Sequence, residues 1–166
     1  MLLKSISKSE FKQIDPARQL IVHEYPRQFA MLDLGQPLGC YGLSWQSSSH
    51  IQPVIERSTD QRTLWIGVDR RLAAIDMQQG NVCISLSVIM PIFQILIVEN
   101  LTAILTELEV LLFSANRTLK CFDVLPDLTA NISVYGSDFM IQMFDGSSFT
   151  LTRSGLIKPM VPAMQL

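Results

Sequence analysis

The chain has 166 residues, of which 48% are hydrophobic and 17% are charged, and its formal net charge is −2. This length suits one domain with a sizeable core, and the high apolar content excludes intrinsic disorder. A charge so close to neutral provides no general field that attracts nucleic-acid phosphates or anionic lipid. We therefore expect a folded protein with no nucleic-acid or membrane partner.

The N-terminal region and the most apolar stretch both bear on location. No apolar run separates the charged residues between Lys4 and Asp15, so we expect no secretory signal. The stretch Val88 to Val98 contains Pro91 and is shorter than the roughly 20 apolar residues of a membrane-spanning helix. A cytoplasmic location is the simplest expectation.

The residues that usually carry chemistry are few and scattered. Cys40, Cys83 and Cys121 are odd in number and far apart, which predicts free thiols. Together with His23 and His50 they lack the spacing of a metal site. The sequence contains no nucleophile elbow, phosphate loop or zinc-protease motif. We predict no catalytic residue, no cofactor and no metal.

The first predicted element is a short helix. Ser7 and Glu10 have the spacing of a capping box, which predicts a helix over Lys8 to Asp15. Beyond it the signals are mixed, with one strand-like run from Phe29 to Leu34. We interpret residues 1–62 as an irregular N-terminal part.

After Thr63 the pattern becomes regular. Leu64 to Val68 and Leu72 to Asp76 are strand-like and are separated by a short turn. From Val82 to Val88 apolar residues alternate with polar ones, which is the period of a strand with one buried face. These three segments predict an antiparallel meander.

The C-terminal third continues in the same style, as a series of hairpins. The expected strands are Val110 to Phe113, Thr118 to Val124, Leu128 to Val134, Phe139 to Phe144 and Ser148 to Thr152. The predicted β-meander thus spans residues 63–152 and is followed by an apolar tail over 153–166. Because no change of composition marks a linker, we predict one domain over residues 1–166.

The segment Leu101 to Phe113 supports two readings. Its leucines and isoleucine recur at helical spacing, with Asn100 placed to cap a helix. Its neighbours on both sides are β-rich, and tertiary context overrides local propensity in short segments. A helix and a pair of short strands are equally compatible with the sequence.

Residues Leu64 to Val88 resemble one blade of a quinoprotein-type β-propeller. Gly67, Ala74, Asp76 and Gly80 stand in the order of that repeat, whereas Ile84 occupies the place of its docking tryptophan. The resemblance implies blade-like sheet topology, and the family's quinone chemistry does not follow from it.

A second copy of this pattern is weaker. Leu119 to Asp123 echoes Leu72 to Asp76, at a spacing within the range of propeller blades. A closed propeller needs at least four blades of about 40 residues each, so this chain could scarcely close one alone.

The candidate interface is a group of arginines that lies near a tryptophan in the sequence. It consists of Arg57, Arg62, Trp65, Arg70 and Arg71. Arginine together with aromatic residues is typical of protein interfaces and of single-strand nucleic-acid binding, and charged residues also protect the edges of sheets. A solvated strand edge is the commonest explanation of such a group, and a protein contact is the main functional alternative.

The sequence therefore predicts an all-β, or β-dominated α+β, protein. We expect an antiparallel meander that forms a sandwich or open barrel, with one or two short helices. The leading functional interpretation is a non-catalytic protein-interaction module that also self-associates, because charged residues are scarce and hairpin edges are numerous. The alternatives are a β-barrel that binds a small apolar ligand and an enzyme of unrecognised type.

Overall fold

The computed structural model describes residues 1–46 and 51–161, and it confirms the all-β class. Strands account for 54% of the chain and helix for 6%. The described strands form four sheets of four strands each, and pairing is antiparallel except between β2 and β4. Residues 47–50, which include His50, and the end of the predicted apolar tail, 162–166, lie outside the described residues.

The four sheets follow one another along the chain. The first contains β1 (Leu2–Ser5), β3 (Gln28–Asp33), β4 (Cys40–Trp45) and β2 (Gln19–Ile21), in that spatial order. The second contains β5 (Val54–Arg57), β6 (Thr63–Val68), β7 (Arg71–Asp76) and β8 (Val82–Ser87). The third contains β9 (Ile92–Val98), β10 (Leu101–Thr106), β11 (Glu109–Phe113) and β12 (Leu119–Val124). The fourth contains β13 (Thr129–Tyr135), β14 (Asp138–Met143), β15 (Ser148–Leu151) and β16 (Ile157–Pro159).

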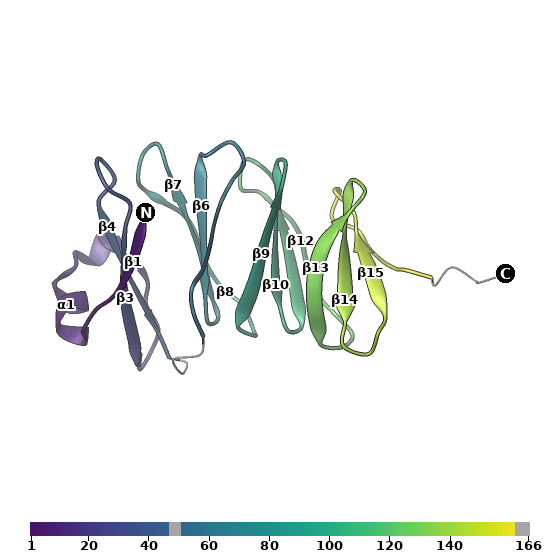
Figure 1. Ribbon diagram of the computed structural model, residues 1–166, viewed down its shortest axis with the longest axis horizontal. Coiled ribbons are helices and arrows are strands. Elements are labelled where there is room, and N and C mark those ends of the chain that lie inside the picture. The colour runs from purple at the N-terminus through teal and green to yellow at the C-terminus, as the bar shows by residue number, and fades with distance from the viewer. Residues whose placement is uncertain (47–50, 162–166) are drawn as a thin grey trace.

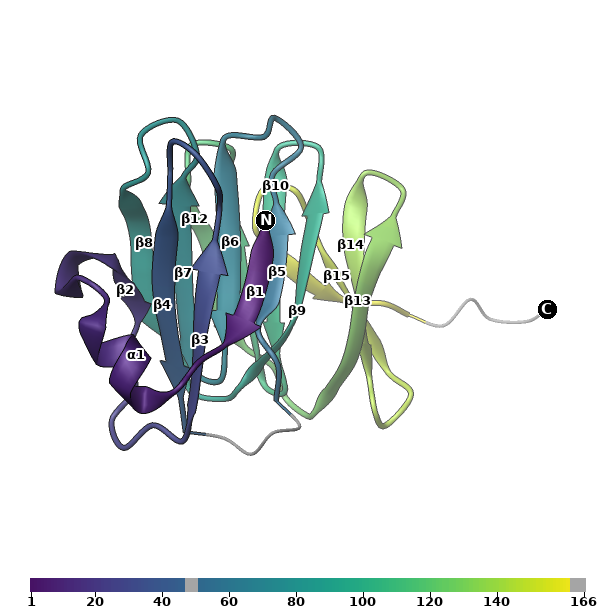
Figure 2. The same ribbon diagram turned by 60° about the vertical axis from the view of Figure 1, so that its left-hand side comes forward.

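The sheets pack face to face in a series (Figure 1), which is neither a two-sheet sandwich nor a barrel. Each pair of neighbouring sheets encloses a separate apolar core, so the two middle sheets are covered on both faces. The first and fourth sheets lie at opposite ends, and the described sheets do not close into a ring. Figure 2 shows β1, β5 and β9 along one side of the series and β2 and β8 along the other.

A short helix covers the outward face of the first sheet. Helix α1 (Lys8–Gln13) begins with the predicted capping box of Ser7 and Glu10. Its Phe11 packs on Phe29 with ring centroids 5.4 Å apart, and a Cβ on Gly42 would lie 2.8 Å from the Phe11 ring. The helix therefore closes this end of the series, because it occupies the face on which another sheet would pack.

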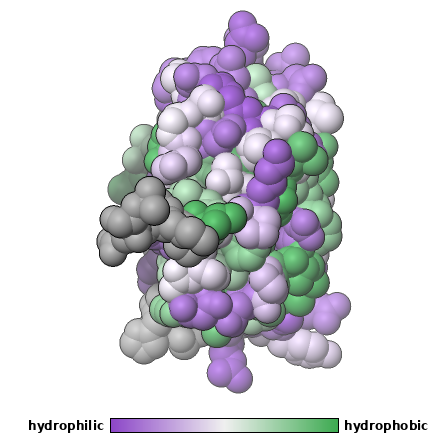
Figure 3. All heavy atoms as spheres, turned by 90° about the vertical axis from the view of Figure 1, so that its right-hand side faces the viewer, coloured by the Kyte–Doolittle hydropathy of each residue, from purple (hydrophilic) through white to green (hydrophobic). Residues whose placement is uncertain are grey.

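The outward face of the fourth sheet is largely polar. Strand pairing places Asn131, Gln142 and Ser148 in one row across the sheet, while Ile132 and Ile141 point to the core. Figure 3 looks onto this end of the molecule and shows mostly hydrophilic and intermediate residues. This face therefore differs from the middle sheets, in which both faces are apolar.

The segment Leu101–Phe113 forms two strands, β10 and β11, joined by a turn at 107–108. Both strands are buried along their whole length, because sheets pack on each side of them. Strands covered on both faces have continuous apolar runs instead of alternating ones. Such a run also contains the spacing of a helix, which explains why the sequence was compatible with both structures.

The resemblance of Leu64 to Val88 to a propeller blade agrees with the sheet topology, since the segment forms β6, β7 and β8 of one four-stranded sheet. The predicted correspondence between Leu119–Asp123 and Leu72–Asp76 is wrong. The first segment lies in β12, an exposed edge strand, whereas the second lies in β7, in the interior of its sheet. The N-terminal part that the sequence leaves irregular holds the complete first sheet.

Candidate functional site

The predicted interface residues do not form one surface. Arg57 and Arg62 flank the turn before β6, whereas Arg70 and Arg71 lie at the turn after it. A strand separates these two turns, so the arginine pairs lie at opposite ends of the second sheet. Arg57 donates a hydrogen bond to Gln61 Oε1 at 3.2 Å, and its side chain is exposed.

Trp65 lies in the core instead of at the surface. Its side chain is 1% exposed and packs on Phe113 of the third sheet, with ring centroids 4.8 Å apart. A Trp with this burial contributes to packing between the sheets and is not available to a partner.

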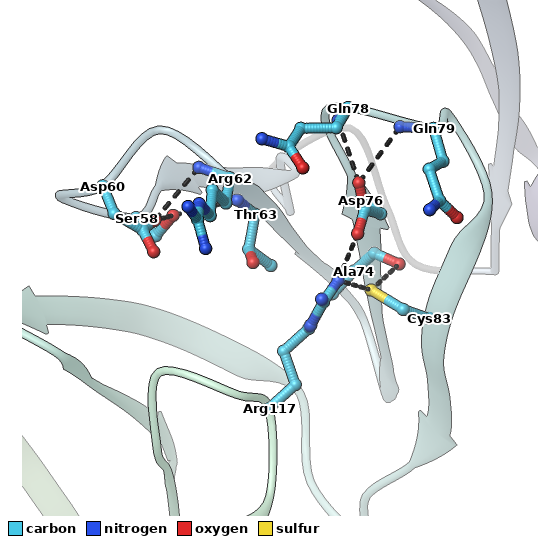
Figure 4. Close-up of polar contacts among 10 residues, drawn as sticks. All are labelled: Ser58, Asp60, Arg62, Thr63, Ala74, Asp76, Gln78, Gln79, Cys83 and Arg117. Atoms are coloured by element: carbon cyan, nitrogen blue, oxygen red, sulfur yellow. Dashed lines mark hydrogen bonds and ion pairs between the residues drawn. The ribbon is translucent and has the colours of Figure 1, made fainter.

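A polar cluster joins the second and third sheets (Figure 4). Asp76 accepts hydrogen bonds from the backbone N–H groups of Gln78 and Gln79 and from the Arg117 guanidinium. The two backbone N–H groups, with a smaller effect of Arg117, lower the pKa of Asp76. Arg117 also donates to the Cys83 sulfur at 3.1 Å. Asp76 therefore stabilises the turn after β7 and, through its contact with Arg117, links the second and third sheets.

Glu109 is a fully buried carboxylate that holds a loop. Its oxygens accept the backbone N–H groups of Ile89 and Met90 at 2.9 to 3.1 Å and the Thr106 hydroxyl at 3.2 Å. Ile89 and Met90 belong to the connection from the second sheet to the third. Glu109 therefore organises this crossing, and exposed Glu107 does not share its environment.

A polar cavity of about 290 Å³ lies at the end of the second sheet where β6 turns into β7. The β6–β7 turn is held in place because Val88 N–H donates to the Arg70 carbonyl at 3.0 Å and Ile92 N–H donates to the Asp69 carbonyl at 2.7 Å. The cavity is lined by His23, Glu24, Gln46, Arg70, Arg71, Ser87 and Val88. The cavity therefore brings Arg70 and Arg71 of the predicted interface close to His23, which follows strand β2 of the first sheet.

His23 is the most unusual group in the cavity wall. Its side chain is buried, and its Nδ1 lies 2.5 Å from the Ser44 carbonyl oxygen, so Nδ1 carries the proton. Burial, with smaller effects of Arg71 and Arg70, lowers the pKa of His23, against the effects of Ser44 and Asp69. Nε2 is enclosed and has no hydrogen-bond partner among the described residues. Sequence reasoning did not find this site, because its parts are far apart along the chain.

The outer edge of the third sheet carries an exposed apolar row, which we call the β12 row. It consists of Leu119, Phe122 and Val124, which are 47%, 53% and 53% exposed. A bulge in the pairing of β11 with β12 sets Leu119 opposite Phe113 and Phe122 opposite Leu111. Because residues opposite each other share a face, the bulge brings Leu119 and Phe122 to the same side of the sheet.

The cysteine thiols and the potential metal ligands are the other groups that could carry chemistry. Cys40, Cys83 and Cys121 are free, as predicted, and burial raises the pKa of the Cys40 and Cys121 thiols. Within residues 1–46 and 51–161, no three His, Cys, Asp or Glu side chains gather in a way that could hold a metal ion. No helix in that part of the chain is long and apolar enough to cross a membrane.

Comparison with known proteins gives a fold and no family. No family model matches the chain, and no curated protein matches its sequence. Among solved structures, the Neurospora crassa Pan2 WD40 domain is similar over 67% of this chain and 38% of its own, with 12% identity and a TM-score of 0.51. The computationally designed Ika8 protein is similar over 85% of this chain and 48% of its own, with 8% identity and a TM-score of 0.53. A chain of the mitotic checkpoint complex is similar over 87% of this chain and 50% of its own, with 9% identity and a TM-score of 0.51.

These similarities concern the fold alone, because the identities are so low. The structural neighbours are WD40 and other β-propeller domains, and the four sheets of this chain agree with propeller blades. The chain spans half or less of the length of the structures that it matches.

Proposed function

We propose that this chain is a non-catalytic protein-interaction module and that a second copy of the chain is one of its partners. The observation that carries the proposal is the β12 row, which leaves three large apolar side chains exposed on an edge strand. The propeller-like fold supports it, since such domains present rigid sheet edges and loops to other proteins. One structural neighbour is itself part of a multiprotein assembly, the mitotic checkpoint complex.

The charges of β12 favour pairing with a copy of itself. Lys120 lies near the beginning of the strand and Asp123 near its end, and both are exposed. If two copies of β12 run antiparallel about a two-fold axis, the Lys120 end of one strand lies beside the Asp123 end of the other. The same axis sets the two β12 rows side by side on one face of the joined sheet, so apolar contact adds to this charge pattern, although Lys120 Nζ also donates to the Arg153 carbonyl at 2.6 Å within its own chain.

A barrel that encloses a small apolar ligand does not fit this fold. The described sheets stack in series, and the spaces between them are filled by three cores of buried side chains. The described sheets therefore do not enclose the interior space that a ligand-binding barrel needs.

The proposal predicts that Phe122→Arg weakens self-association about 30-fold, because a central aromatic residue of an interface contributes about 2 kcal/mol or more. Sedimentation velocity over a concentration series measures the dissociation constant. Phe144→Arg is the matched control, since Phe144 is 74% exposed but lies in the turn after β14 of the fourth sheet. A wild-type chain that stays monomeric at tens of micromolar, or an equal effect of both variants, contradicts the proposal.

A further inference from the structure

We propose that the polar cavity between the first and second sheets binds a phosphate monoester group. Arg70 and Arg71 are its ligands, and His23 in the same wall responds to the bound anion through its protonation. This inference goes beyond the proposed protein contact, because the cavity and the β12 row belong to different parts of the molecule.

The histidine supplies the first argument. The Ser44 carbonyl can only accept, so Nδ1 donates to it and Nε2 of the neutral ring holds a lone pair. Buried polar atoms normally have a partner, and one left unpaired costs free energy. Because Nε2 is enclosed, a bound anion acts on the ring through its charge: it lowers the free-energy cost of protonating Nε2, and the imidazolium then carries the charge opposite to that of the anion.

The arginines supply the second argument. Two consecutive arginines at a hairpin turn line the same cavity as the histidine. Guanidinium groups bind phosphate oxygens in pairs of parallel hydrogen bonds, which makes arginine a preferred phosphate ligand. The two arginines together provide donors for several oxygens of one tetrahedral group.

The charges around the cavity agree with a mono- or dianion. Glu24 is exposed in the cavity wall, where it opposes anion binding, and Gln46 donates to its backbone carbonyl. Asp69 acts on His23 in the direction that favours protonation, whereas Arg70 and Arg71 act against it. A bound anion offsets the effect of the two arginines, so binding and protonation of His23 support each other.

The size of the cavity suits more than a free ion. Its volume of about 290 Å³ is close to the lower end of the range for small-molecule sites, about 300 to 1,000 Å³. It therefore has room for a phosphate group together with part of the molecule that carries it.

Calorimetric titration of the full chain with sulfate and with inorganic phosphate tests the arginines. We expect saturable binding that is weakened at least tenfold in the Arg70→Gln/Arg71→Gln double variant, because each charged donor contributes strongly. Arg57→Gln/Arg62→Gln is the matched control, since it removes the same charge at the other end of the same sheet. Equal affinity of the two double variants overturns the proposal, as does the absence of binding to the wild-type chain.

A second titration tests His23. Sulfate keeps its charge between pH 7.5 and 5.5, so a rise in its affinity over this range reports protonation of the protein. We expect the affinity to rise as the pH falls, by at most tenfold for each unit by which the bound anion raises the pKa of His23. His23→Asn keeps a side-chain N–H that can donate to the Ser44 carbonyl but lacks Nε2, and it should abolish most of the rise. An unchanged pH dependence in His23→Asn, with folding verified by circular dichroism, contradicts the role of His23.

The source of the phosphate group is decided by a third measurement. Cosedimentation with vesicles that contain phosphatidic acid, compared with vesicles that contain phosphatidylserine, tests a lipid monoester. Binding to phosphatidic acid vesicles that depends on Arg70 and Arg71 assigns the site to a lipid headgroup. Binding of inorganic phosphate without vesicle binding assigns it to a soluble phosphate ester, and binding of neither overturns the proposal.

Discussion

Replacing Glu109 with alanine should lower the free energy of unfolding by about 3 to 5 kcal/mol. The carboxylate is fully buried and accepts the backbone N–H groups of Ile89 and Met90 and the Thr106 hydroxyl. Alanine leaves the buried Thr106 hydroxyl and the two backbone N–H groups of the loop without this acceptor. The loop that connects the second and third sheets would lose its fixed path, and urea denaturation followed by circular dichroism measures the effect.

Glu107→Ala is the control for this prediction. Glu107 is two residues away, has the same chemistry and is exposed, so its replacement should change stability by no more than about 0.5 kcal/mol. Glu109→Gln retains an acceptor oxygen and should fall between the two alanine variants. Equal stability of Glu109→Ala and Glu107→Ala would show that the buried carboxylate does not hold the loop.

Trp65→Ala is expected to destabilise the protein by about 3 to 5 kcal/mol, which is the usual cost of removing a large buried aromatic side chain. Trp65 fills the core between the second and third sheets, where it packs on Phe113 and neighbours Leu72 and Ile104. The cavity that alanine leaves lies between two sheets that are joined by one connection. The loss of stability should therefore appear as a lower urea concentration at the midpoint of unfolding.

Trp65→Phe tests whether packing explains the effect. Phenylalanine retains an aromatic ring beside Phe113 and should cost less than half as much as alanine. Trp45→Ala provides a comparison in the core between the first and second sheets, where Trp45 is 5% exposed. A Trp65→Ala chain as stable as the wild type would contradict the face-to-face packing of the second and third sheets.

The candidate interface illustrates how far local sequence information reaches. The arginines are close together along the chain, and the sequence groups them with Trp65 as one candidate interface. The six residues of β6 place Arg62 before the strand and Arg70 after it, so the two pairs point to different surroundings. The side chain of Trp65 points into a core that exists only because the third sheet packs on the second. Proximity in sequence does not imply a shared surface when a strand lies between.

The sequence by itself determined the local features of this protein. The capping box of α1, the strands from Leu64 to Val88 and the free cysteines follow from spacing and composition, because neighbouring residues decide caps, turns and alternation. The tertiary structure decided the rest. Leu101–Phe113 became two strands because sheets cover both of their faces.

The cavity with His23, Arg70 and Arg71 likewise depends on the tertiary structure. His23 follows β2 of the first sheet, and the arginines lie at a turn of the second, so these residues meet only when the two sheets pack. The β12 row depends on a bulge in strand pairing that no local pattern marks. Contacts between segments that are distant in the chain are set by the stacking of sheets, which depends on the shape and burial of whole faces.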